Sequence, residues 1–403
     1  MTAKPKQSIH PYETMNGILV LEDGHFYRGE LFAADVQAAG EVVFNTSPTG
    51  YQEILTDPSY VGQIVVLTTS HVGNYGVNAD DAESSRTRAA GLIVRDYHPV
   101  PSNWRSDRKL ADSLADANVP ALSGVDTRAL VLHTRKAGAL RGVLTRLPES
   151  CIRLPLAGTV LAPGRGTGEH TDAAFHHPDL LQIVEQAKAV SSMAGLDLAS
   201  RVTCRESWTA GDSSAKYHVV CLDFGIKLNI VRQLVALECR VTTVPASTSA
   251  GDILALGPDG VLLSNGPGDP EPLTGPIETI RTLLGKVPIF GICLGHQLFG
   301  LACGGKTYKL KFGHRGGNHP VRDGESGRVE ITAQNHGFAV HAPSLDGRVV
   351  TVTHINLNDD TVEGLRHRRH PAFSVQFHPE ASPGPHDSHH LFRRFVELMQ
   401  RGR

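Results

Sequence analysis

The sequence lacks any apolar stretch of the roughly 20 residues that a membrane-spanning helix needs. Residues 1–13 contain no apolar run of the kind found in a secretory signal. The chain also lacks a strong charge of either sign, since its formal net charge is -2 over 403 residues. Without a basic surplus, a general attraction to nucleic acid is not expected. These absences predict a cytoplasmic protein with neither a membrane nor a nucleic-acid partner.

Cysteine is also scarce. The six cysteines contain no CxxC pair and are too few for a disulfide scaffold in a chain of this length. Reduced thiols are therefore expected, one of which is a candidate nucleophile. Residues 300–307 match the form GxxxxGK[ST], but the match begins inside an expected helix instead of after an expected strand, so ATP is not expected to bind this chain. Residues His386 to His390 include metal-ligating types, but their spacing is not typical of a metal site, so no metal is expected.

The length of the chain exceeds what one hydrophobic core usually supports, so at least two domains are expected. In residues 17–32, apolar residues surround an Asp-Gly turn, a pattern that predicts a β-hairpin. Further short β-like runs occupy residues 41–44, 63–68 and 91–94, and residues 126–135 have a helical pattern. Residues 1–155 are therefore predicted to form a β-rich N-terminal domain that is not a Rossmann fold.

A change of composition follows. Residues 157–172 are rich in glycine and small polar residues without periodicity, which is typical of a linker or loop. A helical stretch around Leu180 to Met193 is expected to lead into the next domain. Residues 156–215 are accordingly predicted to be a linker and a connecting helix.

From Tyr217 onward, short continuous apolar runs alternate with helical periods. Strands are expected at residues 219–222, 240–244, 260–263 and 287–292, and helices at residues 228–235, 277–284 and 294–303. Strands that are buried on both faces and joined by helices are typical of a parallel sheet. Residues 216–403 are therefore predicted to form an α/β domain with a doubly wound, mostly parallel sheet.

The sharpest chemical feature is Cys293 between Gly291 and Gly295, where an expected strand turns into an expected helix. This is the form of a nucleophile elbow with cysteine in place of serine. The glycines permit a tight turn, and the positive end of the helix dipole favours a thiolate. A structural cysteine between two packing glycines is the alternative explanation.

A thiolate nucleophile needs a base, and the base needs a group that orients it. The segment Phe373 to Phe377 has a strand pattern and leads into His378 and Glu380. In an extended chain, residues i and i+2 face the same side, so the carboxylate can orient the imidazole. An isolated histidine is more often structural, but this pair in one domain with an elbow cysteine indicates a catalytic set.

Acyl chemistry also needs hydrogen-bond donors for an oxyanion. The N–H group of Leu294, directly after the nucleophile, is the first candidate donor, and the glycine-containing loop of residues 264–270 is a candidate source of the second. Gln297 lies four residues after Cys293 and is expected on the same face of the helix, where its amide could bind a polar substrate.

These residues carry a family resemblance. Residues 217–400 resemble the class I glutamine amidotransferase domain. The resemblance rests on three motifs in the expected order, namely GPGDP at 266–270, Gly-Ile-Cys-Leu-Gly-His-Gln at 291–297 and His-Pro-Glu at 378–380.

The remainder of the chain resembles the small, glutamine-hydrolysing subunits of carbamoyl phosphate synthetase. The motifs that carry this resemblance are Glu41 to Ser47, Thr49 to Tyr60, Gly124 to Arg128, Asp223 to Ile230, Lys311 to Pro320 and Ala333 to Phe338. The resemblance covers nearly the whole chain, whereas most other amidotransferases lack this N-terminal domain.

The resemblance implies specific roles. Cys293 is implied to be the nucleophile, His378 the base and Glu380 its partner, while Gly268 and Leu294 resemble the oxyanion donors. The residues implied to contact glutamine are Ser59, Gly266, Gln297, Asn335, Gly337 and Phe338.

The implied reaction converts glutamine and water into glutamate and ammonia through a thioester. The ammonia would pass to a large subunit that makes carbamoyl phosphate from bicarbonate and ATP for arginine and pyrimidine synthesis. No cofactor is expected in this chain, and ATP with its metal ion is expected on the large subunit. The rival hypotheses are a cysteine peptidase or other acyl-transfer hydrolase, and an inactive regulatory scaffold. A scaffold should lack one of the three catalytic residue types, and all three are present.

Overall fold

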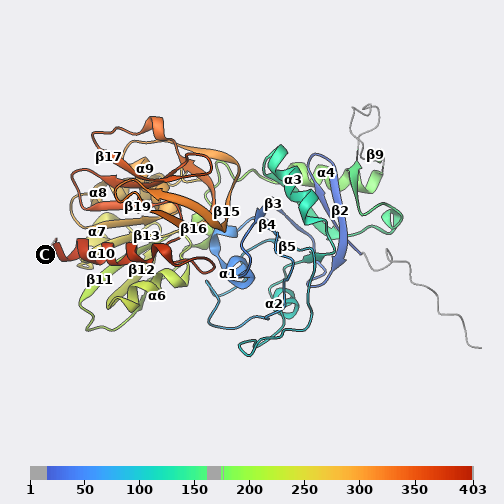
Figure 1. Ribbon diagram of the computed structural model, residues 1–403, viewed down its shortest axis with the longest axis horizontal. Coiled ribbons are helices and arrows are strands. Elements are labelled where there is room, and N and C mark those ends of the chain that lie inside the picture. The colour runs from blue at the N-terminus through green and yellow to red at the C-terminus, as the bar shows by residue number, and fades with distance from the viewer. Residues whose placement is uncertain (1–15, 161–173, 176, 402–403) are drawn as a thin grey trace, which may run out of the picture. The chain divides into compact units, whose positions relative to one another are not determined.

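The computed structural model describes residues 16–160, 174–175 and 177–401 (Figure 1). The chain forms two compact units. The first comprises Met1–Phe44, Gly62–Asn78 and Ala90–Ser191, and the second comprises Asn45–Val61, Ala79–Ala89 and Ser192–Arg403. These units differ from the expected boundaries, because two short segments of the N-terminal sequence belong to the second unit. Most of the predicted glycine-rich linker, residues 161–172, lies outside the described residues.

The first unit is built on a nine-stranded sheet with the order β1-β7-β3-β4-β5-β6-β2-β8-β9. Its strands are β1 (Gly17–Leu21), β2 (His25–Leu31), β3 (Ala38–Asn45), β4 (Gln63–Leu67), β5 (Gly91–Ile93), β6 (Ala121–Ser123), β7 (Leu140–Arg146), β8 (Ala157–Val160) and β9 (Ala174–Phe175). The antiparallel pairing of β1 with β2 confirms the predicted hairpin, and it closes the strands from β1 to β2 into a ring. Gly24 in its turn adopts a φ of 94°, which favours glycine.

The helices of the first unit are α2 (Leu110–Asp116), α3 (Thr127–Ala137), α4 (Pro178–Ala189) and a 3₁₀ turn at Glu149–Cys151. The predicted helix near residues 126–135 is confirmed as α3. Asp126 caps it by accepting a hydrogen bond of 2.9 Å from the N–H group of Ala129. Gly138 with a φ of 106° ends it.

Helix α4 belongs to the core of the first unit, although its segment was expected to be a connection. Its buried face consists of Leu180, Ile183, Val184 and Ala187. These side chains share a hydrophobic cluster with residues of β1, β2 and β7, namely Ile18, Val20, Phe26 and Val143. Leu180 is fully buried. The apolar stripe of α4 therefore completes a core instead of bridging two domains.

The second unit contains a ten-stranded sheet with the order β10-β12-β11-β13-β14-β19-β18-β17-β15-β16. The strands are β10 (Trp208–Ala210), β11 (Tyr217–Asp223), β12 (Cys239–Pro245), β13 (Gly260–Leu263), β14 (Ile289–Ile292), β15 (Thr307–Asp323), β16 (Val329–Val340), β17 (Val350–Asn356), β18 (Val362–His367) and β19 (Ala372–Val375). From β12 through β11, β13 and β14 to β19 the neighbours run parallel. The predicted parallel α/β core is confirmed, and the sheet is extended on both sides by antiparallel strands that the sequence did not indicate.

Helices cover both faces of this sheet (Figure 1). Apolar residues of α7 (Ala250–Ala255), α8 (Thr274–Leu283) and α9 (Leu294–Ala302) pack in one core cluster, and those of α6 (Leu228–Ala236) and α10 (His390–Arg401) pack in the other. The remaining short helices of this unit are α1 (Tyr51–Thr56), α5 (Ala199–Val202) and 3₁₀ turns at Pro58–Tyr60, Ala342–Ser344 and Asp387–His389. The carboxyl ends of the parallel strands lie at one edge of the sheet, and at this edge β14 leads into α9. Among the residues that the structure describes, no helix is both long and apolar enough to cross a membrane.

The packing of α4 can be tested by mutation. Leu180→Ala should lower the free energy of unfolding of the first unit by about 2–5 kcal/mol, the usual loss for a buried leucine. Gln182→Ala, on the exposed face of the same helix, should change it by less than about 0.5 kcal/mol. Urea unfolding of the full chain measures both. Equal and small effects of the two substitutions would show that α4 lies outside the core.

Candidate active site

Cys293 occupies a strained turn between β14 and α9. Its φ of 55° and ψ of -104° are unusual for a residue other than glycine, and such strain is common at nucleophile elbows. A Cβ atom on Gly295 would lie 2.2 Å from the carbonyl oxygen of Leu263, and one on Gly291 would lie 2.8 Å from that of Gly295. Both flanking positions therefore require glycine. The structure forms the predicted elbow, with Cys293 only 2% exposed.

His378 and Glu380 follow β19 and lie in the same site. His378 Nδ1 and Glu380 Oε1 are 2.7 Å apart, and both side chains are buried. Burial opposes a charge on the imidazole, but Glu380, followed by Cys293, raises the pKa of His378 to about 10. The other ring nitrogen, Nε2, is buried and has no hydrogen-bond partner among the described residues. The imidazole is therefore oriented by Glu380 and keeps Nε2 available for chemistry.

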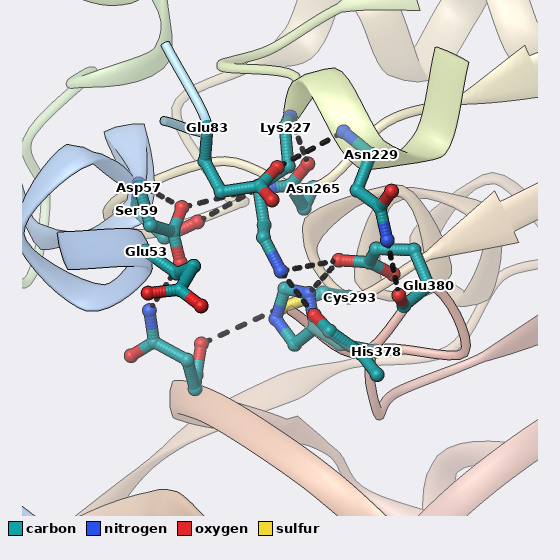
Figure 2. A network of polar contacts seen from close by, with 12 residues as sticks. Glu53, Asp57, Ser59, Glu83, Lys227, Asn229, Asn265, Cys293, His378 and Glu380 are labelled. Atoms are coloured by element: carbon teal, nitrogen blue, oxygen red, sulfur yellow. Dashed lines mark hydrogen bonds and ion pairs between the residues drawn. The ribbon is translucent and has the colours of Figure 1, made fainter. Parts of the chain in front are cut away.

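Lys227 is a third charged group at this position, and sequence reasoning did not single it out. Its ammonium group is buried, lies 3.0 Å from Glu380 Oε1 and donates a hydrogen bond of 2.5 Å to the carbonyl oxygen of Ala381 (Figure 2). Burial opposes its charge, but Glu380, followed by Glu83, raises the pKa of Lys227. Burial alone would raise the pKa of Glu380, whereas Lys227 and then His378 lower it to about 2. Glu380 is therefore held ionised by two partners.

Asp57 holds together residues that are far apart in the sequence (Figure 2). Its carboxylate accepts hydrogen bonds from the Ser59 N–H group at 2.8 Å and from Asn335 Nδ2 at 2.9 Å. Asn265 Nδ2 lies 3.0 Å from Ser59 Oγ and 3.4 Å from the same carboxylate. All four residues belong to the second unit, because residues 45–61 are part of it. Ser59 is therefore part of this site.

Glu83 and Asn229 connect the start of α6 to the same network. The Asn229 N–H group donates to Glu83 Oε2 at 2.9 Å, and Asn229 Nδ2 donates to the carbonyl oxygen of Glu380 at 2.6 Å. Burial raises the pKa of Glu83 to about 7, although Lys227 opposes this shift. Asn229 therefore joins the backbone of the catalytic loop to the segment of residues 79–89.

The predicted oxyanion donors lie in the loop of residues 264–270 and at the start of α9. A Cβ atom on Gly266 would lie 2.2 Å from the carbonyl oxygen of Phe224, and Gly268 has a φ of 89°, so the loop requires glycine at both positions. Leu294 is the first residue of α9, and the N–H group at that position has no acceptor within its own helix. The structure thus leaves a backbone donor directly beside Cys293.

Gln297 was expected on the same face of α9 as Cys293, and its side chain reaches β16. Its Nε2 donates hydrogen bonds to the carbonyl oxygen of Phe338 at 2.8 Å and to Gln376 Oε1 at 3.1 Å. Gln376, which sequence reasoning missed, in turn points Nε2 toward Cys293 Sγ at 3.7 Å. Because the amide nitrogen of Gln297 is engaged, a contact with a substrate would fall to its side-chain oxygen. Asn335 is also close, since its carbonyl oxygen lies 3.6 Å from Cys293 Sγ.

The parallel α/β core, the glycine-flanked cysteine and the histidine–glutamate pair together define a class I glutamine amidotransferase domain. The model of the family "Glutamine amidotransferase class-I" matches residues 220–398. The model "Carbamoyl-phosphate synthase small chain, CPSase domain" matches residues 19–144.

Full-length relatives narrow the family further. The carbamoyl phosphate synthase small chain of Syntrophotalea carbinolica is 51% identical, with 96% of this chain and 99% of that protein covered. The same protein of Chlorobaculum tepidum is 52% identical, with coverages of 95% and 98%. The pyrimidine-specific small chain of Halalkalibacterium halodurans is 50% identical, with coverages of 95% and 96%. This chain belongs to the carbamoyl phosphate synthase small-chain family.

The geometry predicts different losses at the two members of the histidine–glutamate pair. His378→Asn should lower kcat/KM for glutamine by about 10²–10⁴-fold, the usual contribution of a positioned proton-transfer group. Glu380→Gln should cost less, because an amide oxygen can still accept the hydrogen bond from Nδ1. Since Glu380 raises the pKa of His378, its removal should move the alkaline limb of the pH profile to lower pH.

Steady-state kinetics of both variants between pH 6 and pH 11 would check this, with the wild-type chain as reference. Equal losses in the two variants, or an alkaline limb that stays in place in Glu380→Gln, would contradict the roles assigned to the pair.

Proposed function

We propose that this chain is the glutamine-hydrolysing subunit of a carbamoyl phosphate synthetase and that Cys293 is its nucleophile. The observation that supports this most strongly is the elbow cysteine beside a buried histidine–glutamate pair. The pair belongs to a domain that matches the amidotransferase family model, and the N-terminal part of the same protein matches the model of the carbamoyl-phosphate synthase small chain. The substrate of this site is L-glutamine.

In the proposed first half-reaction, the Cys293 thiolate attacks the side-chain amide carbon of glutamine. The N–H groups of Leu294 and Gly268 stabilise the oxyanion that forms. Protonated His378 then donates a proton to the departing amine, the C–N bond breaks, and ammonia leaves behind a thioester. Glu380 stabilises the imidazolium and keeps Nε2 directed at the reacting atoms.

In the second half-reaction, neutral His378 removes a proton from water, and the resulting hydroxide attacks the thioester carbonyl. The tetrahedral intermediate collapses, the C–S bond breaks, and glutamate leaves with the thiolate regenerated. A thiolate, an imidazole and backbone donors supply every step. We therefore propose that glutamine hydrolysis needs no cofactor in this chain.

The proposed contacts to glutamine are Ser59, Gly266, Gln297, Asn335, Gly337 and Phe338. Two of these, Ser59 and Asn335, are held by Asp57 through hydrogen bonds. The network around Asp57 thus supports the proposal by fixing polar groups from β16 and from residues 45–61 on one side of Cys293.

The proposed partner is the large synthetase subunit, which would combine the ammonia with bicarbonate and ATP to make carbamoyl phosphate for arginine and pyrimidine synthesis. ATP and its metal ion would bind that subunit. The full-length relatives are named as small chains, which supports this division. A cytoplasmic location is part of the proposal, and six unpaired cysteines support it.

The division of chemistry between two chains predicts a selective defect. In a complex with a large subunit, Cys293→Ser should lower carbamoyl phosphate synthesis from glutamine by at least about 10³-fold, because loss of the nucleophile disables a catalytic triad as a whole. Synthesis from added ammonium salt should survive, since ammonia enters after the thioester step. The substitution removes little volume and should leave the assembly intact.

The measurement compares product formation from glutamine and from ammonium for wild-type and variant chains with the same large subunit. Loss of both activities in a variant that still assembles would refute the two-site reaction. Unchanged synthesis from glutamine would remove Cys293 from the mechanism. Turnover of peptides in place of free glutamine would favour the peptidase hypothesis.

A further inference from the structure

A second cluster of reactive side chains lies outside the proposed catalytic set. His314 of β15, His336 of β16 and Glu363 of β18 each place one potential ligand atom within 4.8 Å of the others. His314 and His336 are directly paired in the register of their two strands. All three side chains are buried, with Glu363 fully inaccessible. The cluster therefore connects three strands of the sheet through its interior.

Each histidine of the cluster uses one ring nitrogen for a hydrogen bond, and the other has no partner among the described residues. His314 Nε2 is 2.7 Å from Asp359 Oδ2, and His336 Nδ1 is 2.7 Å from the carbonyl oxygen of Phe338. Because both partners are acceptors, these nitrogens carry the protons. Within the part of the chain that the structure describes, His314 Nδ1 and His336 Nε2 are buried without a hydrogen-bond partner. Metal-binding histidines are commonly oriented in this way, with the outer N–H bonded to a carboxylate or a carbonyl.

The carboxylate of Glu363 is likewise held in place. Oε1 accepts a hydrogen bond of 2.9 Å from Asn356 Nδ2, and Oε2 accepts one of 3.0 Å from Gln334 Nε2. Oε1 is also 3.7 Å from His314 Nδ1. That separation is too long for a hydrogen bond. It is close to the distance of about 3.4 Å between two ligands that each lie about 2.1 Å from a tetrahedral zinc ion.

We propose that His314, His336 and Glu363 bind a divalent transition-metal ion of the zinc class. Imidazole nitrogen and carboxylate oxygen are zinc ligands, and a fully buried carboxylate is favourable only when it is paired or coordinates a cation. His319 is the candidate fourth ligand, and it lies outside the cluster of three whose ligand atoms are within 4.8 Å of one another. Its Nδ1 is also buried with no hydrogen-bond partner in the described ranges, and its ring centroid is 5.2 Å from that of His314.

The proposed ion is structural. The strand β16 carries His336 and also Asn335, Gly337 and Phe338, the proposed contacts to glutamine. An ion that joins β15, β16 and β18 would fix the position of that strand. Its loss should raise KM for glutamine more than it lowers kcat. This kinetic consequence rests on the proposed function, whereas metal binding itself does not.

No spacing in the sequence indicated this site, and we expected no metal. The four side chains come from three separate strands, and their spacing matches no zinc motif. The sheet register alone brings His314 opposite His336.

The test uses the full chain and zinc itself. After purification and dialysis, elemental analysis should find about one zinc ion per wild-type chain. Glu363→Gln should weaken zinc binding in competition titrations by at least about 100-fold, because even changes in the groups that support ligands cost 10–100-fold. Glu330→Gln is the matched control. Glu330 is also buried and lies 2.7 Å from His390 Nε2, but it belongs to no such cluster, so this variant should bind like the wild type.

Two outcomes would overturn the proposal. One is that the wild-type chain takes up no zinc. A proton on His314 would then take the place of the proposed ion. The other is equal uptake by all three chains, which would place the ion on other histidines. Should Glu363→Gln fail to fold, Co²⁺ added to the wild type decides. Visible d–d bands without a thiolate charge-transfer band, abolished by one equivalent of zinc, support the site, and their absence refutes it.

Discussion

The carboxylate of Glu380 is the group on which the rest of the second unit depends. It is fully buried and lies between His378 at 2.7 Å and Lys227 at 3.0 Å. Removing either partner from a buried pair leaves an uncompensated charge and typically costs about 3–5 kcal/mol. Because the pKa of Glu380 falls from its ordinary value of 4.5 to about 2, its ionised form stabilises the folded state above pH 4.5. That contribution disappears as the pH falls toward 2.

The need to stabilise this charge explains why distant segments of the chain meet here. Lys227 stands just before α6, Asn229 holds the backbone of Glu380, and Glu83 holds the backbone of Asn229. The segment of residues 79–89 is therefore tied to the catalytic loop through one asparagine. Asp57 ties residues 45–61 to the loop of residues 264–270 through Asn265 and to β16 through Asn335. Two excursions from the N-terminal sequence thus become structural parts of the amidotransferase unit.

The elements that were predictable from the sequence are those whose signal is local. The elbow at Cys293 follows from two glycines between a buried strand and a helix, and α3 follows from its periodicity and its Asp126 cap. The contacts of Lys227 with Ala381 and of Asp57 with Asn335 could not be predicted in this way, because the partners are more than 100 residues apart in the sequence. The packing of α4 was missed because an amphipathic helix shows that it has a buried face but does not show which core it joins.

The antiparallel strands β15 and β16 show the same division between local and non-local information. Their register shifts at two places, and no sequence periodicity survives across such irregularities. The register nevertheless places Asn335 toward Asp57 and its neighbour His336 toward His314. Successive residues of a strand face opposite sides, so one strand serves two buried polar clusters at once. A change in register by one residue would turn Asn335 to the side of His314 and His336 to the side of Asp57. The strand therefore has to be fixed along its length, and polar contacts on both of its faces accomplish this.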